Sequence, residues 1–299
     1  MNTPATSAPP CAPPDFNPRT PKLTLPVLTC DTHAHILGPI ARYAYSPARV
    51  YTPPDCVLDA YRQMLATLGV ARAVLVQPSV YGSDNTVMLE AMHAAGSAFR
   101  GVAVVEDDIT DAELARLNTA GVRGVRVNIV DVKDRKPGTL PMAQLVALAQ
   151  RIARLDGGWH MEFLMHCDEF PDLDRAFADF PVDIVLGHLG YMKTDKGLND
   201  PGFQALLRLM QAGKAWVKLT GPYRITTQAM PHADTDSFAH ALIAANAARV
   251  LWGSDWPHVM VKSAMPNDGN LCDLLSNWIP DAATREQVLV KNPAKLYGF

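Results

Sequence analysis

The chain alternates short apolar runs, rich in β-branched residues, with segments whose apolar residues recur at helical spacing. The short runs predict buried strands at residues 25–35, 71–79, 99–105, 122–129, 160–166, 182–190, 215–221 and 250–256. The segments between and after them predict helices at residues 54–68, 84–95, 111–118, 141–155, 172–180, 201–212, 236–246 and 281–290. Each predicted strand is therefore followed by one predicted helix.

Strict alternation of strands and helices favours a parallel sheet with right-handed crossovers. Eight such units in 299 residues are typical of a (β/α)₈ TIM barrel, which is the predicted fold. A doubly wound open sheet is the alternative. No G-x-G-x-x-G motif follows the first predicted strand, so the sequence gives no support to dinucleotide binding.

The first part of the chain differs in composition from the rest. Residues 1–22 contain seven prolines among small and polar residues, which predicts an extended arm with little structure of its own. The predicted division is a proline-rich arm at residues 1–24 and a barrel domain at residues 25–299. The arm can lie along its own domain or reach a neighbouring subunit, and the sequence leaves both open.

Composition and charge limit the classes of molecule that this protein is expected to bind. The chain is 48% hydrophobic and carries a net charge of −3 without a basic run, which argues against nucleic acid but suits a local basic pocket for an anionic small molecule. No apolar stretch is long enough for a membrane span, and no secretory signal is visible. Five scattered cysteines argue against a disulfide framework. These features predict a cytoplasmic protein, either a monomer or a homo-oligomer.

Polar and titratable side chains gather where the predicted strands end. In a (β/α)₈ barrel the carboxyl ends of the strands carry the active site. The residues at these ends, in chain order, are His33, His35, Ser79, Arg126, Asn128, His166, His188, Arg224, Asp255 and His258. Along the first strand, Asp31, His33 and His35 are expected to share one face because side chains alternate. Two imidazoles on one face can hold a metal ion or polarise a carbonyl group.

Each of these residues also has a structural interpretation. His166 could lie in a loop, Arg126 could extend from the outer face of the barrel, and Asp255 could cap a turn. The joint pattern at the ends of the first, sixth and eighth strands is harder to explain in this way. It favours a functional site.

Three motifs resemble the amidohydrolase superfamily. They are Asp31-Thr32-His33-Ala34-His35, Gly187-His188 and Gly253-Ser254-Asp255-Trp256-Pro257-His258. The chain most resembles the branch that contains 2-pyrone-4,6-dicarboxylate lactonase and sugar-acid lactonases, because the segments around Tyr51, Gln77, Arg126 and Thr220 also fit that branch. The resemblance covers roughly residues 25–299.

The resemblance implies a role for each site residue. Asp255 would be the general base that activates water. His33, His35 and His188 would polarise the substrate carbonyl or hold a metal ion that does so. Arg126 and Arg224 would bind substrate carboxylates. The remaining substrate-binding candidates are Tyr51, Ser79, Asn128 and His258.

The resemblance also bears on whether the active site holds a metal ion. Many members of the superfamily bridge two metals with a carbamylated lysine on the fourth strand, but here the inward positions of that strand are Arg126 and Asn128. We therefore expect no binuclear site and favour a reaction without metal. The alternative is one zinc ion held by His33, His35, His166 and Asp255.

The predicted function is hydrolysis of the lactone ring of a small carboxylated substrate. A first alternative is a zinc-dependent decarboxylase or amide hydrolase of the same superfamily. A second alternative is a barrel that binds an acidic metabolite without catalysis.

Overall fold

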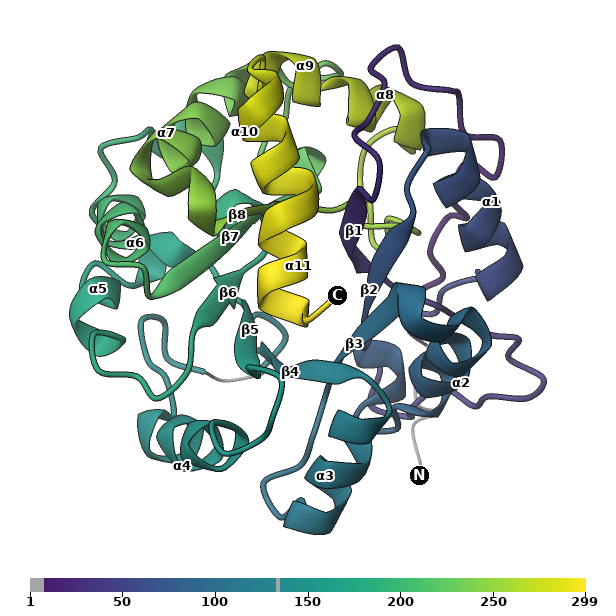
Figure 1. The fold of residues 1–299 in the computed structure, drawn as a ribbon, viewed down its shortest axis with the longest axis vertical. Coiled ribbons are helices and arrows are strands. Elements are labelled where there is room, and N and C mark those ends of the chain that lie inside the picture. The colour runs from purple at the N-terminus through teal and green to yellow at the C-terminus, as the bar shows by residue number, and fades with distance from the viewer. Residues whose placement is uncertain (1–7, 133–134) are drawn as a thin grey trace, which may run out of the picture.

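Eight parallel strands form one sheet in the order of the chain (Figure 1). The structure is a computed structural model that describes residues 8–132 and 135–299. The strands are β1 (Cys30–Ala34), β2 (Arg72–Val76), β3 (Phe99–Ala103), β4 (Val122–Asn128), β5 (His160–Leu164), β6 (Ile184–Leu186), β7 (Ala215–Leu219) and β8 (Val250–Trp252). Each strand pairs with the next in parallel, which confirms the predicted (β/α)₈ barrel.

The barrel closes between β1 and the segment that follows β8. The Asp255 amide donates to the His33 carbonyl at 2.8 Å, and the His35 amide donates to the Trp256 carbonyl at 2.8 Å. Ala34 and Trp256 form the parallel bridge between the two segments. Closure therefore places Asp255 beside both histidines of the first strand.

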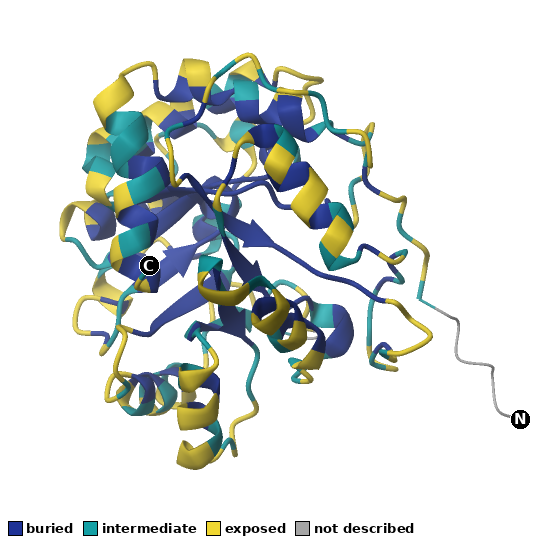
Figure 2. Cartoon of the chain, turned by 45° about the vertical axis from the view of Figure 1, so that its right-hand side comes forward, coloured by how far each residue is buried: buried dark blue, intermediate teal, exposed yellow. Residues whose placement is uncertain are grey.

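The helices surround the strands, with their exposed sides outward and their buried sides against the sheet (Figure 2). The helix α1 (Leu58–Leu68) shows why: Tyr61, Met64, Leu65 and Leu68 form its buried face, and Gly69 ends it in the left-handed conformation. The next helices are α2 (Thr86–Ala95), α3 (Asp111–Thr119), α4 (Met142–Ile152), α5 (Leu173–Ala176), α6 (Pro201–Gln211) and α7 (Asp236–Asn246). All of them fall within predicted helices or extend them by one residue.

The C-terminal segment differs from the prediction. Two helices, α8 (Asp268–Asp273) and α9 (Leu275–Trp278), were not predicted. The predicted helix at 281–290 is α10 (Ala282–Glu286), and it continues through a π-helical turn (Gln287–Lys291) into α11 (Asn292–Tyr297). Pro293 lies in the first turn of α11, directly after the π-helical turn, and the helix continues past it to Tyr297.

The C-terminal helix covers the amino ends of the strands. In Figure 1, α11 crosses the barrel opening. Its Tyr297 packs edge-to-face on His160, the first residue of β5, with ring centroids 5.2 Å apart. Access to the interior is therefore at the opposite end, where the strands finish.

The described part of the N-terminal arm lies along the barrel. The Cys11 amide donates to the Thr52 carbonyl at 2.9 Å, and the Thr52 amide donates to the Pro9 carbonyl at 2.8 Å. Further along, the amides of Lys22 and Leu23 donate to Asp273 of α8 at 2.7 and 3.1 Å. Residues 1–7 of the predicted arm lie outside the described residues, and the division at residue 24 stays a prediction.

Within the described residues, no helix combines the length and apolar character needed to cross a membrane.

Asp31 departs from the expected alternation along the first strand. The pairing register of β1 with β2 shifts between Asp31 and Ala34. The Asp31 carboxylate accepts hydrogen bonds from Tyr61 of α1 at 2.9 Å and from the Ser254 amide at 2.8 Å. Asp31 therefore ties β1 to α1 and to the segment after β8, and it does not line the cavity that the histidines face.

Replacement of Asp31 by Asn is expected to destabilise the fold. Asparagine keeps the size but loses the charge that strengthens these buried hydrogen bonds, at a cost of about 1–3 kcal/mol. Urea unfolding measures the change in the free energy of unfolding, with Asp59→Asn on the exposed surface of α1 as the matched control. Equal stability of the two variants would contradict the assigned role.

Candidate active site

A cavity of about 250 Å³ opens at the carboxyl ends of the strands. Eight of the residues predicted from the sequence line it: His33, His35, Tyr51, Ser79, Arg126, His188, Arg224 and Asp255. Its other lining residues are Val130, Asp131, Leu164, Tyr191, Val259, Met260 and Lys262. The (β/α)₈ fold therefore brings most of the predicted site together.

Three predicted residues lie outside this lining. Asn128 ends β4 and bonds the loop that follows, accepting from the Val130 amide at 3.1 Å and donating to Asp131 at 2.7 Å. His258 is buried behind the cavity, between Tyr223 and Asp268, at 2.8 and 3.1 Å. His166 stacks on Tyr191 and bonds the carbonyl of that residue at 2.7 Å. These three side chains support neighbours of the cavity.

Four of the lining residues, His188, Tyr191, Asp255 and Met260, have left-handed backbones, and two of them belong to the predicted site. His188 follows β6 and Asp255 follows β8, with φ of 54° and 66°. Residues other than glycine rarely occupy this left-handed region, and such strain persists where the surrounding structure holds it in place. Here the strain turns both side chains back over the barrel opening, toward His33.

Each of the three histidines that line the cavity uses its Nδ1 to bond an acceptor. The acceptors are Glu162 Oε1 for His33 at 3.0 Å, the Val76 carbonyl for His35 at 2.7 Å and the Thr220 carbonyl for His188 at 3.3 Å. Carbonyl oxygens only accept, so Nδ1 carries the proton in His35 and His188. In His33, Glu162 Oε1 at 3.0 Å is nearer to Nδ1 than the Lys218 amine at 3.4 Å, which favours the same tautomer. The Nε2 atoms are then left as lone pairs.

Burial keeps these imidazoles neutral. It lowers the pKa of His35 to about 3 and that of His188 to about 4, with the charge of Arg126 or Arg224 contributing in the same direction. The pKa of His33 also lies well below its usual range, because of burial and the nearby Lys218. At neutral pH the cluster therefore offers hydrogen-bond acceptors and not positive charge.

The two oxygens of Asp255 have different surroundings. Oδ2 accepts from the Tyr223 hydroxyl and from Arg224 Nε, both at 2.6 Å. Oδ1 has no hydrogen-bond partner in the described part of the chain and lies 3.7 Å from His33 Nε2. Burial alone would raise the pKa of Asp255, but the charge of Arg224 and its hydrogen bond to the carboxylate hold the pKa well below its usual range. The carboxylate is therefore ionised, with one oxygen free.

The two arginines differ in how far their charge is neutralised. Arg224 pairs with Asp255 and also donates to the Val259 carbonyl at 3.1 Å. Arg126 donates to the Gln77 carbonyl at 2.6 Å and forms no ion pair with any carboxylate of the described residues. A half-buried guanidinium without a counter-ion is unfavourable unless an anion binds it.

Two buried charged residues, Lys218 and Glu162, lie below the cavity and were not predicted from the sequence. Lys218 of β7 donates to Glu162 of β5 at 2.6 Å and to the Thr32 carbonyl at 2.6 Å. The other oxygen of Glu162 is the acceptor for His33 Nδ1. A single charged residue inside each of two apolar strands was the available signal, because a fully buried strand has no solvent face on which to place a charge.

A family model described as amidohydrolase matches residues 30–299. The chain belongs to the amidohydrolase family.

Named relatives of this amidohydrolase include two lactone hydrolases. The 2-pyrone-4,6-dicarboxylate hydrolase of Comamonas testosteroni is 36% identical over 290 residues, which cover 94% of this chain and 93% of that protein. The 4-sulfomuconolactone hydrolase of Rhizobium radiobacter is 36% identical over 292 residues, which cover 97% and 96%.

The fold of this chain is also similar to that of a solved structure. The crystal structure of a probable 2-pyrone-4,6-dicarboxylic acid hydrolase from Acinetobacter baumannii, with citric acid bound, superposes with a TM-score of 0.78. Its sequence is 26% identical, and the match covers 91% of this chain and 100% of that one.

The amidohydrolase site contains one set of groups suited to a metal ion. In the described residues, atoms of His33, His188 and Asp255 able to ligate a metal lie within 4.8 Å of one another. Two imidazoles with free Nε2 and a carboxylate with a free oxygen match the donors of catalytic zinc sites. This set differs from the predicted zinc ligands, because it includes His188 and leaves out His35 and His166. The Glu162 contact with His33 is also the kind that orients a metal-binding imidazole.

Replacement of Glu162 by Gln is expected to lower both stability and turnover. It leaves the buried Lys218 without its counter-ion, which costs about 3–5 kcal/mol, and it weakens the hold on His33, which costs about 10- to 100-fold in activity. The double variant Glu162→Gln/Lys218→Met is expected to regain much of the stability but not the activity.

Chemical unfolding and the steady-state rate measure the two effects, with the exposed Glu106→Gln as the control. A double variant no more stable than Glu162→Gln would contradict the charge argument.

Proposed function

We propose that this amidohydrolase opens the lactone ring of a small carboxylated substrate by adding water to the ring carbonyl. The observation that carries the proposal is that one cavity holds both the free oxygen of Asp255 and the unpaired guanidinium of Arg126. The first can take a proton from water, and the second can bind a carboxylate. The lactone hydrolases that are 36% identical over nearly the whole chain support this choice of substrate class.

Asp255 is proposed as the general base. Tyr223 and Arg224 hold its Oδ2, so Oδ1 is the atom left to accept a proton. A carboxylate with a depressed pKa is a weak base, and position has to compensate. Two hydrogen bonds of 2.6 Å fix that position before substrate binds.

The histidines are proposed to act through their Nε2 lone pairs. Such lone pairs can accept from the attacking water or hold a cation, but a neutral acceptor cannot stabilise an oxyanion by donating to it. Polarisation of the carbonyl therefore needs positive charge from elsewhere. In a reaction without metal, which was the favoured prediction, Arg224 beside Asp255 supplies it.

A metal-dependent reaction is the second candidate, as a lactonase, a decarboxylase or an amide hydrolase. The convergence of His33, His188 and Asp255 within 4.8 Å favours it. A divalent ion such as zinc at these residues would supply Lewis acidity and lower the pKa of bound water. His35, whose Nε2 is also free, would then remain an acceptor beside the substrate.

Lactone hydrolysis is tested by acid release from a panel that includes 2-pyrone-4,6-dicarboxylate and sugar-acid lactones, followed with a pH indicator. We expect turnover of at least one carboxylated lactone and a loss of about 10²–10⁴-fold in Asp255→Asn, as is typical for a general base. The exposed Asp107→Asn is the matched control.

Turnover that survives a chelator favours the reaction without metal, and loss on chelation with recovery on adding zinc favours the metal-dependent lactonase. No turnover of any lactone by the wild-type protein would refute the proposal, and binding without turnover would favour a non-catalytic barrel.

Replacement of Arg126 and of Arg224 by methionine is expected to change different kinetic parameters. Arg126→Met removes a charge-assisted contact with the substrate, so KM rises by about 10- to 100-fold while kcat changes little. Arg224→Met removes the partner of Asp255, so kcat falls, and the pKa of the Asp255 carboxyl rises toward its usual range. The acid limb of the pH–rate profile should then move to higher pH in Arg224→Met only. Identical kinetic changes in both variants would show that the arginines share one role.

A further inference from the structure

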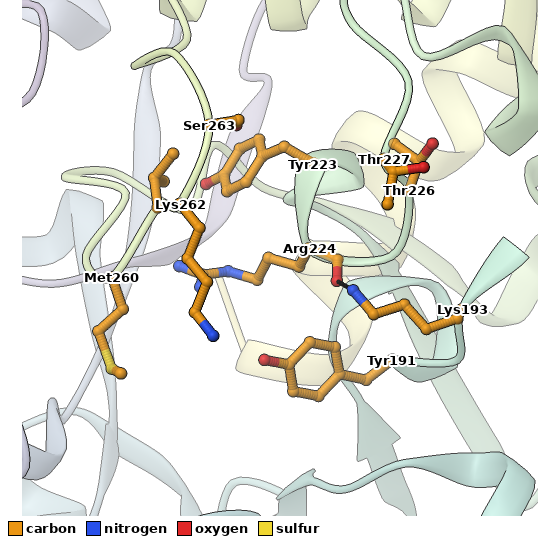
Figure 3. A pocket seen from close by; sticks show the side chains of 10 residues that line it. Tyr191, Lys193, Tyr223, Arg224, Thr226, Thr227, Met260, Lys262 and Ser263 are labelled. Carbon is orange, nitrogen blue, oxygen red and sulfur yellow. Dashed lines mark hydrogen bonds between the residues drawn. The ribbon is translucent and has the colours of Figure 1, made fainter.

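A second cavity, of about 390 Å³, adjoins the active-site cavity on its outer side. The two cavities share Tyr191, Arg224, Met260 and Lys262, so they lie directly side by side. Figure 3 shows Lys262 extending from the segment after β8 across the cavity, toward the side of Tyr191. Lys262 and the outer cavity therefore lie next to the place where a ligand would bind at Asp255.

The outer cavity is positively charged. Lys193 and Lys262 line it together with Arg224, and no aspartate or glutamate of the described residues lines it, whereas Asp131 and Asp255 line the inner cavity. Neither lysine forms an ion pair with a carboxylate in residues 8–132 or 135–299. Within the part of the chain that the structure describes, Lys193 donates one hydrogen bond, to the Arg224 carbonyl at 2.8 Å, which leaves two of its three donors free there. In a protein with a net charge of −3, this local excess of cations is selective for anions.

Arg224, which lines both cavities, cannot fully neutralise a second anion. The charge of Arg224 is already paired with Asp255. Among the described residues, the cations of the two cavities that form no ion pair are therefore Arg126 in the inner cavity and the two lysines toward the outside. This arrangement offers separate places for two anionic groups of one ligand.

The volumes of the two cavities also favour a ligand that extends from the inner cavity into the outer one. The inner cavity, at about 250 Å³, is smaller than the roughly 300–1,000 Å³ usual for small-molecule sites. The outer cavity adds about 390 Å³ beyond it, with a shared wall. A substrate confined to the inner cavity would leave the larger and more basic part of the site unused.

We propose that Lys262 and Lys193 form a second anion subsite, which binds a carboxylate or sulfonate of the substrate away from the reacting carbonyl. The inference rests on the proposed lactone hydrolysis and deepens it. Arg126 binds the first anionic group inside the barrel, Asp255 faces the ring carbonyl, and the lysines bind the second group at the mouth. The lysines thereby select lactones with two negative charges over lactones with one.

The kinetic test compares substrates with one and two charges. The variants Lys262→Met, Lys193→Met and the double variant are assayed on 2-pyrone-4,6-dicarboxylate, on its two monocarboxylate analogues and on a sulfonated lactone acid. We expect the ratio of kcat/KM for the diacid over the monoacids to fall by about tenfold in Lys262→Met and further in the double variant. The ratio for the sulfonated lactone tells whether sulfonate is also bound there.

Lys295→Met, an exposed lysine on α11 at the opposite end of the barrel, is the charge-matched control and should leave the ratio unchanged. Equal losses on the diacid and on the monoacids, or no change of the ratio, would overturn the subsite.

A binding test separates this inference from the proposed reaction. Calorimetry with citrate as the probe, at fixed ionic strength, compares the wild type with the double lysine variant and with Lys295→Met. We expect the double variant to bind citrate about tenfold more weakly and the control to bind it as the wild type does. If the wild type hydrolyses no lactone, the reaction is refuted, while the citrate result still decides whether the lysines bind anions. Unchanged citrate affinity in the double variant would overturn the subsite.

Discussion

The compensation of buried charge organises the interior of this barrel. Lys218, Glu162, His33, Asp255 and Arg224 follow one another from the middle of the strands to the cavity, and each is in contact with the next. A charge of this kind is stable away from water only when a partner of opposite sign or a hydrogen-bond donor satisfies it. Glu162 and Lys218, which do not line the cavity, hold His33 in place, while Arg224 and Tyr223 at its wall leave one oxygen of Asp255 free.

This dependence explains which parts of the molecule the sequence could predict. Alternating apolar runs indicate a (β/α)₈ barrel, and the carboxyl ends of its strands gather the polar residues, so His33, His188, Arg126 and Asp255 were found together. Glu162 was missed because a charge in an apolar strand gives no sign of which partner compensates it. Lys218, its partner, lies two strands and 56 residues away.

Other differences between the predicted and the observed site have local structural causes. The alternation argument placed Asp31 with the histidines, but the register shift in β1 turns it toward Tyr61 and Ser254. His166 lies at a strand end like the others, yet it bonds and stacks on Tyr191. Strand position alone does not distinguish a side chain that lines the cavity from one that supports its wall. Only the contacts made across the barrel do so.

The geometry also limits how the site can supply positive charge. Neutral histidines with free lone pairs surround an ionised Asp255, so the centre of the cluster attracts cations and repels anions. The cations that could attract an anionic substrate lie around this centre, at Arg126 on one side and at Arg224, Lys193 and Lys262 toward the mouth. A carboxylated lactone is therefore drawn in by its acid groups and held at the edges. Its ring carbonyl is then left over the region where water, or a metal ion, is the favoured occupant.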